Sequence, residues 1–279
     1  MTPEGPVRQT GPGVRLAVLG DPIAHSRSPV LHRAGCAALG LACESVALRT
    51  PLDALHTTLD RLAAEGFTGC NLTMPLKAAA LGWVREASPA ARRARSVNTI
   101  TFAPAGARGD TTDGDGFLDL LRALDRDPAR ARVTLLGSGG SARSLAVALA
   151  EHGRGAHVVS RRAPGTDPDW GEVRIASFST WGSPEARSEL AAADVVVNCT
   201  PLGAADSPAP PEALGRNALV VDLTYGDDVT AWVKQARASG REAVDGLGLL
   251  VHQAHRSLAI WLERDLPLSA LATAVGWPR

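Results

Sequence analysis

Short runs of apolar residues alternate along this chain with longer stretches in which apolar residues recur every three or four positions. The runs predict buried strands, and the spaced stretches predict amphipathic helices. In the first part of the chain, strands are predicted at 14–20, 43–49, 67–73 and 96–103, and helices at 30–41, 52–66 and 76–87. This alternation is typical of an α/β fold with a parallel-rich sheet.

The pattern restarts after residues 111–116, which read TTDGDG. Strands are then predicted at 132–137, 156–162, 193–200 and 218–224, and helices at 117–125, 141–153 and 249–265. The sequence therefore predicts two α/β domains, covering residues 14–112 and 113–247. We expect the C-terminal helix, with the rest of 248–279, to return to the first domain. Residues 1–13 contain several Pro and Gly and are expected to form a disordered tail.

Composition narrows the class of protein. Of the 279 residues, 45% are hydrophobic and 21% are charged, and 29 Lys and Arg balance 29 Asp and Glu. This balance is typical of a globular protein and gives no electrostatic footprint for nucleic acid or an anionic membrane. No apolar stretch approaches the roughly 18 residues of a membrane span. We therefore expect a small-molecule partner, with no nucleic acid and no membrane.

The four cysteines indicate the cellular compartment. They form no CxxC pair and have no His partner at zinc-ligand spacing. This spacing argues against a metal site and against a disulfide scaffold. We therefore predict no metal and a reducing, cytoplasmic location.

A glycine-rich turn lies between the predicted strand 132–137 and the predicted helix 141–153. Gly137, Gly139 and Ala142 fit the pattern G-x-G-x-x-[G/A] in the strand-to-helix context where it means dinucleotide binding. Glycines allow backbone N–H groups to approach a pyrophosphate, and the helix N-terminus favours the anion. Residues 113–247 are therefore predicted to be a Rossmann-type domain, although a purely structural glycine turn is the alternative.

The end of the next predicted strand bears on the choice of cofactor. Where an acidic residue would bind the ribose of NAD, this chain has Ser160, Arg161 and Arg162. Two cations there favour the 2'-phosphate of NADP. Solvated charges at a strand end are the competing interpretation, so NAD stays possible.

Lysine is rare in this chain, where only Lys77 and Lys234 interrupt the use of arginine. Arginine keeps its charge permanently, whereas burial and neighbours can tune a lysine amine until it exchanges a proton. Lys77, in the stretch NLTMPLK, is therefore a candidate for proton transfer. The alternative is an ordinary surface cation.

Other polar residues of the first domain follow its predicted strands. Ser26 and Ser28 lie two apart in HSRSP, where Pro29 suits the first position of a helix and makes Ser28 the predicted N-cap. Further polar residues at strand ends are Asn71, Thr73, Lys77, Asn98 and Asp113. Strand ends of an α/β sheet gather at one crevice. Together these residues suggest a binding site for a polyhydroxylated acid.

Seven motifs in order make the chain resemble the shikimate dehydrogenase family. They read VLGDPIAHSRSP, NLTMPLK, SVNT, GDTTDG, LGSGGSAR, NCTPLG and DGLGLLVHQA, and the resemblance spans residues 14–253. It implies a two-domain enzyme with its cleft between the domains. The implied reaction interconverts 3-dehydroshikimate and shikimate with NADP(H), in the biosynthesis of aromatic amino acids.

The resemblance also implies roles for particular residues. Lys77 and Asp113 match the catalytic pair. The implied substrate-binding residues are Ser26, Ser28, Thr73, Asn98, Tyr225 and Gln253. The implied cofactor-binding residues are Gly137, Ser138, Gly139, Gly140, Ser141, Ser160, Arg161, Arg162, Thr200, Pro201, Leu202, Gly203 and Gly246.

Two positions differ from the family pattern. Thr111 stands where the family usually has Asn, and SRR at 160–162 replaces the common NRT. Alternatives therefore stay open: a paralogue that uses quinate or an amino analogue of shikimate with NAD, a different oxidoreductase on this fold, or a catalytically silent NADP-binding or shikimate-binding regulator. The sequence is compatible with a monomer or a homodimer.

Overall fold

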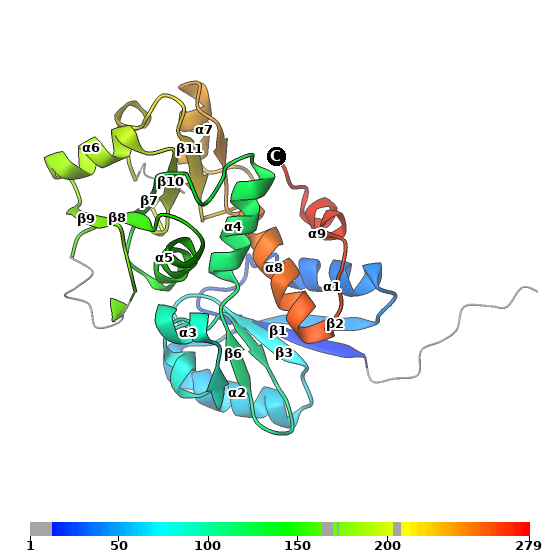
Figure 1. The fold of residues 1–279 in the computed structure, drawn as a ribbon. Coiled ribbons are helices and arrows are strands. Elements are labelled where there is room, and N and C mark those ends of the chain that lie inside the picture. The colour runs from blue at the N-terminus through cyan, green and yellow to red at the C-terminus, as the bar shows by residue number, and fades with distance from the viewer. Residues whose placement is uncertain (1–12, 163–169, 172, 203–207) are drawn as a thin grey trace, which may run out of the picture.

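The described residues form two β-sheets, and the first contains both parallel and antiparallel strands. The computed structural model describes residues 13–162, 170–171, 173–202 and 208–279, and its elements form two lobes (Figure 1). The first sheet has the order β2-β1-β3-β5-β6-β4. Its strands are β1 (Val14–Gly20), β2 (Cys43–Arg49), β3 (Gly69–Leu72), β4 (Glu86–Ala87), β5 (Thr99–Thr101) and β6 (Arg108–Asp110). β1 pairs in parallel with β2 and β3, whereas β5 is antiparallel to β3 and β6.

The second sheet is parallel in every described pair and has the order β12-β11-β10-β7-β8-β9. Its strands are β7 (Val133–Leu136), β8 (Ala156–Ser160), β9 (Ser177–Thr180), β10 (Val195–Asn198), β11 (Leu219–Asp222) and β12 (Ala243–Val244). Numbered within this lobe, the order is 3-2-1-4-5-6 when read from β9. This is the order of a Rossmann fold, which confirms the fold class predicted from the glycine motif.

Helices cover both faces of each sheet. They are α1 (Ser28–Ala38), α2 (Leu55–Ala64), α3 (Pro89–Ala94), α4 (Asp113–Ala123), α5 (Gly140–His152), α6 (Pro184–Ala192), α7 (Ala231–Ala238), α8 (Leu247–Leu262) and α9 (Leu268–Val275). Alternate residues of β1 show the division of the first core: Leu16 packs with α1, α8 and α9, whereas Ala17 and Leu19 pack with α2. In the second lobe, α4 and α5 cover one face and α6 and α7 the other.

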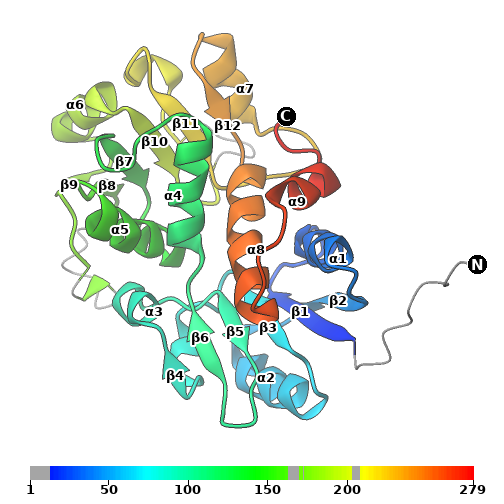
Figure 2. The same cartoon turned by 45° about the vertical axis from the view of Figure 1, so that its right-hand side comes forward.

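Helices α4 and α8 lie side by side between the two lobes (Figure 2). Two glycines of α4 allow this close packing. A Cβ on Gly116 would lie 2.8 Å from the backbone nitrogen of Gln253 in α8, and one on Gly114 would lie 2.4 Å from the carbonyl oxygen of Ser144 in α5. The stretch TTDGDG is therefore the beginning of a helix, and Asp113 lies in its first turn.

Three local predictions are wrong. The helix predicted over 76–87 is a 3₁₀ turn (Ala79–Gly82) followed by β4, because Arg85 and Glu86 donate hydrogen bonds to the carbonyl of Ala107 at the sheet edge. The segment after the predicted helix 249–265, where no further helix was predicted, contains α9, which ends at Gly276 in the left-handed conformation with φ of 67°. Ser28 is not the N-cap of α1; Arg27 is, and the Ser26 hydroxyl accepts from the Ser28 N–H at 3.4 Å.

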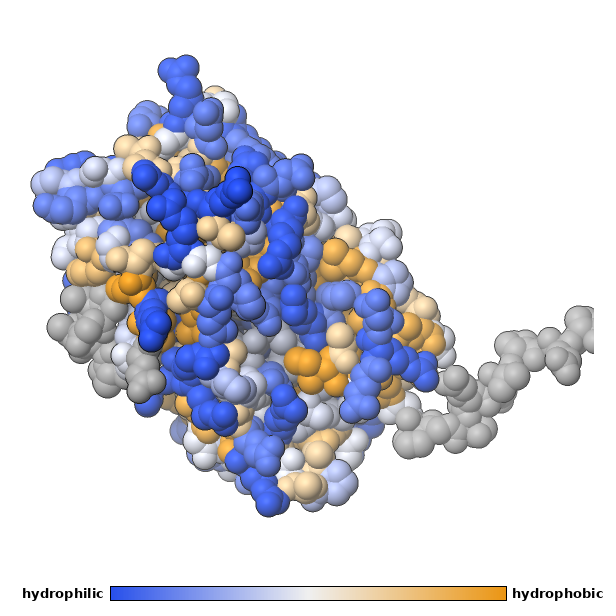
Figure 3. Space-filling model, in the orientation of Figure 1, coloured by the Kyte–Doolittle hydropathy of each residue, from blue (hydrophilic) through white to orange (hydrophobic). Residues whose placement is uncertain are grey.

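The surface of the face in Figure 3 is mainly hydrophilic, and its hydrophobic residues lie in small separate groups. Among the described residues, no helix is both long enough and apolar enough to cross a bilayer. In the same part of the chain, no group of three or more His, Cys, Asp or Glu is placed to hold a metal ion.

Candidate active site

A cavity of about 320 Å³ lies between the two lobes, at the ends of β1 and β3 and beside α4, α5 and α8. All of the predicted catalytic and substrate-binding residues line it: Ser26, Ser28, Thr73, Lys77, Asn98, Asp113, Tyr225 and Gln253. Two predicted cofactor residues, Ser141 and Gly246, also line it. The fold thus brings together residues that lie as far apart in the sequence as Ser26 and Gln253.

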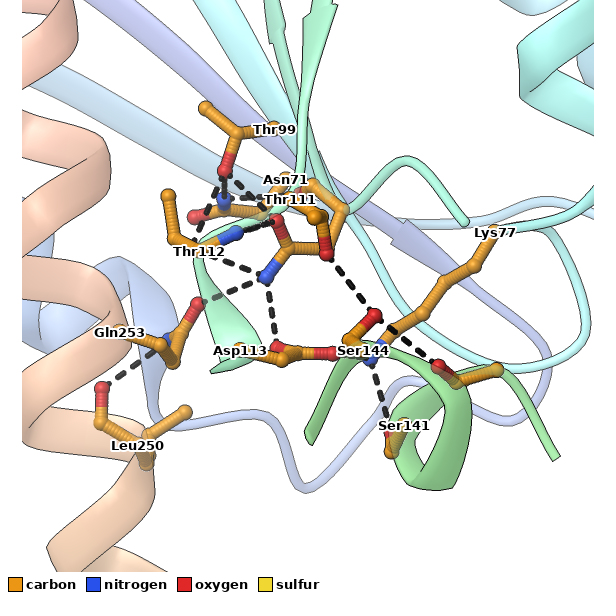
Figure 4. A network of polar contacts seen from close by, with 12 residues as sticks. Asn71, Lys77, Thr99, Thr111, Thr112, Asp113, Ser141, Ser144, Leu250 and Gln253 are labelled. Atoms are coloured by element: carbon orange, nitrogen blue, oxygen red, sulfur yellow. Dashed lines mark hydrogen bonds and ion pairs between the residues drawn. The ribbon is translucent and has the colours of Figure 1, made fainter. Parts of the chain in front are cut away.

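An ion pair between a lysine and an aspartate lines this cavity and belongs to the polar network in Figure 4. Lys77 Nζ donates to Asp113 Oδ2 at 2.6 Å and to Ser141 Oγ at 3.2 Å. The Lys77 side chain is 16% exposed and that of Asp113 is 6% exposed. Because Ser141 lies in the first turn of α5, the lysine joins the substrate side of the cavity to the glycine-rich loop.

Asn98 holds the carboxylate of this pair in place (Figure 4). Its side-chain nitrogen donates to Asp113 Oδ1 at 2.7 Å, and its side-chain oxygen accepts from the backbone N–H of Thr112 at 2.8 Å. The amide nitrogen also lies 3.4 Å from Oε1 of Gln253. Both carboxylate oxygens of Asp113 therefore have a donor, which fixes their direction.

A buried polar network beneath the site was missed in the sequence. The Asn71 amide nitrogen donates to the Asn98 carbonyl, the Thr99 hydroxyl and the Ser257 hydroxyl, at 2.9 to 3.1 Å. Its amide oxygen lies 2.9 Å from Nε2 of His32. Sequence periodicity carried no signal for this network, because it joins segments far apart in the chain.

His32 is buried and neutral in this network. An amide oxygen can only accept, so Nε2 of His32 donates to Asn71, and Nδ1 accepts from the Ser45 hydroxyl at 2.8 Å. Burial lowers the pKa of His32 to about 4, although the hydrogen bond to Asn71 opposes this shift. At neutral pH the imidazole is therefore an uncharged link that fixes Asn71.

The serine-rich loop after β1 meets the only tyrosine of the chain. Tyr225 lines the cavity together with Ser26 and Ser28. Burial raises the pKa of the Tyr225 phenol, and the Arg27 backbone and the Ser26 side chain oppose the shift. Ser28, which is 5% exposed, lines the cavity beside them. These hydroxyls and the N-terminus of α1 form a set of donors suited to a carboxylate.

The glycine-rich loop has the shape that a pyrophosphate requires. Gly137 has φ of 111°, and a Cβ there would lie 2.8 Å from Cγ2 of Thr200. A Cβ on Gly139 would meet no atom within 4 Å, so the space above the N-terminus of α5 is open. Gly140 and Ser141 form the first turn of α5. These residues fit a phosphate-bearing cofactor.

The other predicted cofactor residues lie around the same sheet edge. Ser160 is buried at the end of β8, where its hydroxyl donates to the Arg162 carbonyl, and Arg161 and Arg162 are exposed. After β10, Thr200 donates to Oδ1 of Asn198, and Pro201 and Leu202 are exposed. Gly203 lies outside the described residues.

Gly246 occupies a position where only glycine fits. A Cβ there would lie 2.3 Å from the carbonyl oxygen of Leu223. The backbone N–H of Gly246 donates to the Thr224 carbonyl at 2.9 Å. The start of α8 therefore lies directly against the segment that carries Tyr225.

Comparison with known proteins identifies close relatives. A family model described as the shikimate dehydrogenase substrate binding domain matches residues 18–100. The shikimate dehydrogenase (NADP(+)) of Xanthomonas euvesicatoria is 40% identical over 264 residues, which cover 90% of this chain and 91% of the relative.

Two solved structures show how closely the fold is shared. Shikimate 5-dehydrogenase from Thermus thermophilus, in complex with NADP(H) and shikimate, has a TM-score of 0.83 at 33% identity and covers 94% of this chain and 98% of its own. A ligand-free 5-ketofructose reductase of Gluconobacter has a TM-score of 0.80 at 26% identity, with 95% and 98% covered. Enzymes named for different substrates therefore share this fold.

Proposed function

The chain belongs to the shikimate dehydrogenase family, and from that premise we propose that Lys77 and Asp113 carry its reaction. The enzyme is an oxidoreductase that interconverts 3-dehydroshikimate and shikimate with NADP(H), in the biosynthesis of aromatic amino acids. The observation that carries the assignment of residues is the 2.6 Å contact between Lys77 Nζ and Asp113 Oδ2 inside the cavity.

Lys77 is the proton donor in the direction of reduction. The cofactor supplies a hydride to the ketone carbon, so the carbonyl oxygen needs a proton to become the hydroxyl of shikimate. A lysine amine carries a proton at neutral pH and can give it up, whereas a guanidinium cannot. In the reverse direction Lys77 accepts the hydroxyl proton while the hydride leaves the same carbon.

Asp113 orients the amine and holds the substrate. Its Oδ2 accepts from Lys77, and its Oδ1 accepts from Asn98, so the carboxylate cannot rotate without breaking one of these bonds. Ser141 Oγ accepts a hydrogen bond from a second N–H of the same ammonium. The third proton of the Lys77 ammonium is available to a substrate oxygen.

The rest of the cavity divides between the two ends of the substrate. Ser26, Ser28 and Tyr225 supply hydroxyl donors for its carboxylate. Thr73, Asn98 and Gln253 face its ring hydroxyls. Both groups line the same cavity, which supports their role in binding one small molecule.

The cofactor would bind at the carboxyl end of the second sheet. Residues 137–141 would hold its pyrophosphate, and Ser160, Arg161 and Arg162 would surround its 2'-phosphate. The residues that would flank its nicotinamide are Thr200, Pro201, Leu202, Gly203 and Gly246. Support comes from the open space at Gly139 and the exposed side chains of the two arginines.

The proposal extends to domain limits and location. Residues 14–112, completed by 248–279, form the substrate domain, and 113–247 form the cofactor domain. The four cysteines are free, which supports a cytoplasmic location.

The test is initial velocity, measured by the absorbance of reduced nicotinamide. Shikimate and quinate are each combined with NADP⁺ and NAD⁺, and 5-ketofructose is offered with NADPH and NADH. We expect the largest kcat/KM for shikimate with NADP⁺. A dominant rate with another substrate or with NAD⁺ would contradict the proposed specificity. Absence of turnover in every combination would favour the binding-protein alternative.

A further inference from the structure

Arg279 lies close to the cavity although it comes last in the sequence. Its Nε and Nη2 atoms contact Asp245 Oδ2 at 3.0 and 2.5 Å. Its Nη1 donates to the Asp227 carbonyl at 2.9 Å, and its Nη2 donates to the Gly226 carbonyl at 3.0 Å. The guanidinium of Arg279 therefore joins the loop at residues 226–227 to the loop that contains Asp245. Helix α7 and strand β12 lie between these two loops in the sequence.

Asp245 is the buried partner of this arginine. Its side chain is 1% exposed, and that of Arg279 is 20% exposed. The other carboxylate oxygen, Oδ1, accepts from the backbone N–H of Leu247 at 3.1 Å, at the first turn of α8. Asp245 thus fixes the start of the helix that carries Gln253, and Arg279 balances its charge.

Both loops held by Arg279 deliver residues to the cavity. Gly226 directly follows Tyr225, and Asp245 directly precedes Gly246; Tyr225 and Gly246 line the cavity. The opposite side of the Tyr225 loop is held by the serine-rich loop, where Arg27 Nη2 lies 3.3 Å from Asp227 Oδ1. That contact is exposed, with the Asp227 side chain fully accessible, so it holds the loop weakly.

The segment after α9 is anchored where it reaches Arg279. The Trp277 ring packs edge-on against His252 of α8, with ring centroids 5.4 Å apart, and its backbone N–H donates to the Ala272 carbonyl at 3.0 Å. A Cβ on Gly248 would lie 3.0 Å from Nε1 of Trp277. The absence of a side chain at 248 lets the tryptophan lie against α8, and this places Arg279.

We propose that Arg279 is a positioning residue that holds Tyr225 and the start of α8 in the geometry needed to bind the substrate carboxylate and ring. This inference rests on the function proposed above. Arg279 itself does not line the cavity. Its role is to keep Tyr225 at the cavity, because it fixes the two carbonyls that follow Tyr225.

The test uses a double variant, Asp245→Asn with Arg279→Met. Removing Arg279 alone would leave a buried unpaired carboxylate and lower stability directly. In the double variant the asparagine oxygen can still accept from Leu247, so helix α8 keeps its cap while the clamp is lost. The matched control is Arg126→Met with Glu242→Gln, which removes a 2.7 Å ion pair in the same lobe outside the cavity.

We expect the double variant to raise KM for shikimate about tenfold, while kcat and KM for NADP⁺ change less than about twofold. In the single variant Arg279→Lys, KM for shikimate should lie between those of the wild type and the double variant, because an amine can pair with Asp245 but cannot span both carbonyls. The control should match the wild type. An unchanged KM for shikimate, or a loss confined to kcat, would overturn the proposal.

Hydrogen exchange tests the role of Arg279 independently of the proposed enzyme activity. The amide of Gly246, which donates to the Thr224 carbonyl at 2.9 Å and so joins the two loops, should exchange faster in the double variant than in the wild type or the control, whether or not the protein turns over shikimate. Unchanged exchange there overturns the clamp. An inactive wild type overturns the proposed function and leaves the exchange measurement valid.

Discussion

The chain contains two lysines, and each forms an ion pair with an aspartate at the same distance. Lys77 and Asp113 are 2.6 Å apart, and so are Lys234 and Asp228. The first pair is buried, with side chains 16% and 6% exposed, whereas the side chains of the second are 55% and 75% exposed. Distance alone therefore does not separate a functional pair from a surface pair.

The surroundings separate them. In the buried pair, Asn98 donates to the other carboxylate oxygen of Asp113, and Ser141 accepts from Lys77, so both charges have a fixed direction. In the surface pair, Lys234 lies in α7 and Asp228 in the turn before that helix, and the hydrogen bond from Lys234 lowers the pKa of Asp228. Burying two charges costs several kcal/mol of desolvation, so a buried pair is weak support for stability. The position of the first pair is better explained by chemistry than by stability.

The largest expected effect comes from replacing the lysine of the buried pair. Lys77→Arg keeps the charge but removes the exchangeable proton, so kcat should fall about 100-fold to 10,000-fold. Steady-state kinetics would measure this, with shikimate and NADP⁺ binding followed by calorimetry to show that the site is still formed. Lys234→Arg is the matched control and should keep full activity. A Lys77→Arg variant with wild-type kcat would remove Lys77 from the reaction.

The second effect concerns the network beneath the pair. His32 has its pKa lowered from 6.5 to about 4, so between these pH values the unfolded chain binds a proton that the folded chain does not. Stability therefore rises with pH through this window and is lost as pH falls from 6.5 to 4. At about 1.4 kcal/mol per pH unit, His32 contributes up to about 3 kcal/mol to that loss.

Urea unfolding at several pH values would measure this contribution. In His32→Gln no imidazole remains at that position, so the fall in unfolding free energy between pH 6.5 and 4 should be smaller than in the wild type. His56, which is exposed on α2, gives the matched control, and His56→Gln should keep the wild-type slope. Equal slopes in all three proteins would show that His32 is not the group that titrates.

The third effect concerns Arg161 and Arg162, the exposed arginines that we propose contact the cofactor. Arg161→Ala with Arg162→Ala should raise KM for NADP⁺ about tenfold or more, because charged hydrogen bonds to the 2'-phosphate are lost. KM for NAD⁺, which lacks that phosphate, should change little. Arg154→Ala removes another exposed cation of the same lobe and serves as the control. Parallel increases for both cofactors would place the two arginines elsewhere.

Much of this site could be predicted from the chain itself, since motif order located Lys77, Asp113 and the glycine-rich loop. The glycine motif predicted a Rossmann-type domain, whereas the order of its strands was not predicted and comes from the structure. Tertiary contacts decided what was missed. Asp113 lies in a helix because Gly114 and Gly116 pack against other helices, although glycines in sequence indicate a turn.

The network around His32 could not be predicted for a similar reason. Its histidine reads as one more residue of an amphipathic helix. Only the pairing of β1 with β3, and the packing of α1 and α8 on the same face, bring His32 and Asn71 together with Ser257. These contacts join residues that are 39 and 186 positions apart in the chain, for which local sequence carries no signal.

The smallest expected effect comes from removing the exposed lysine–aspartate pair. Lys234→Met with Asp228→Asn removes the surface pair, and the unfolding free energy should change by less than about 1 kcal/mol, because exposed ion pairs gain little over solvation. Any change should shrink further at about 1 M salt, where charges are screened over roughly 3 Å. Urea unfolding at low and high salt, with kcat measured alongside, checks both points. A loss of activity here would mean that the turn before α7 communicates with Tyr225, which lies only three residues before Asp228, and the contrast between the two lysines would no longer rest on burial.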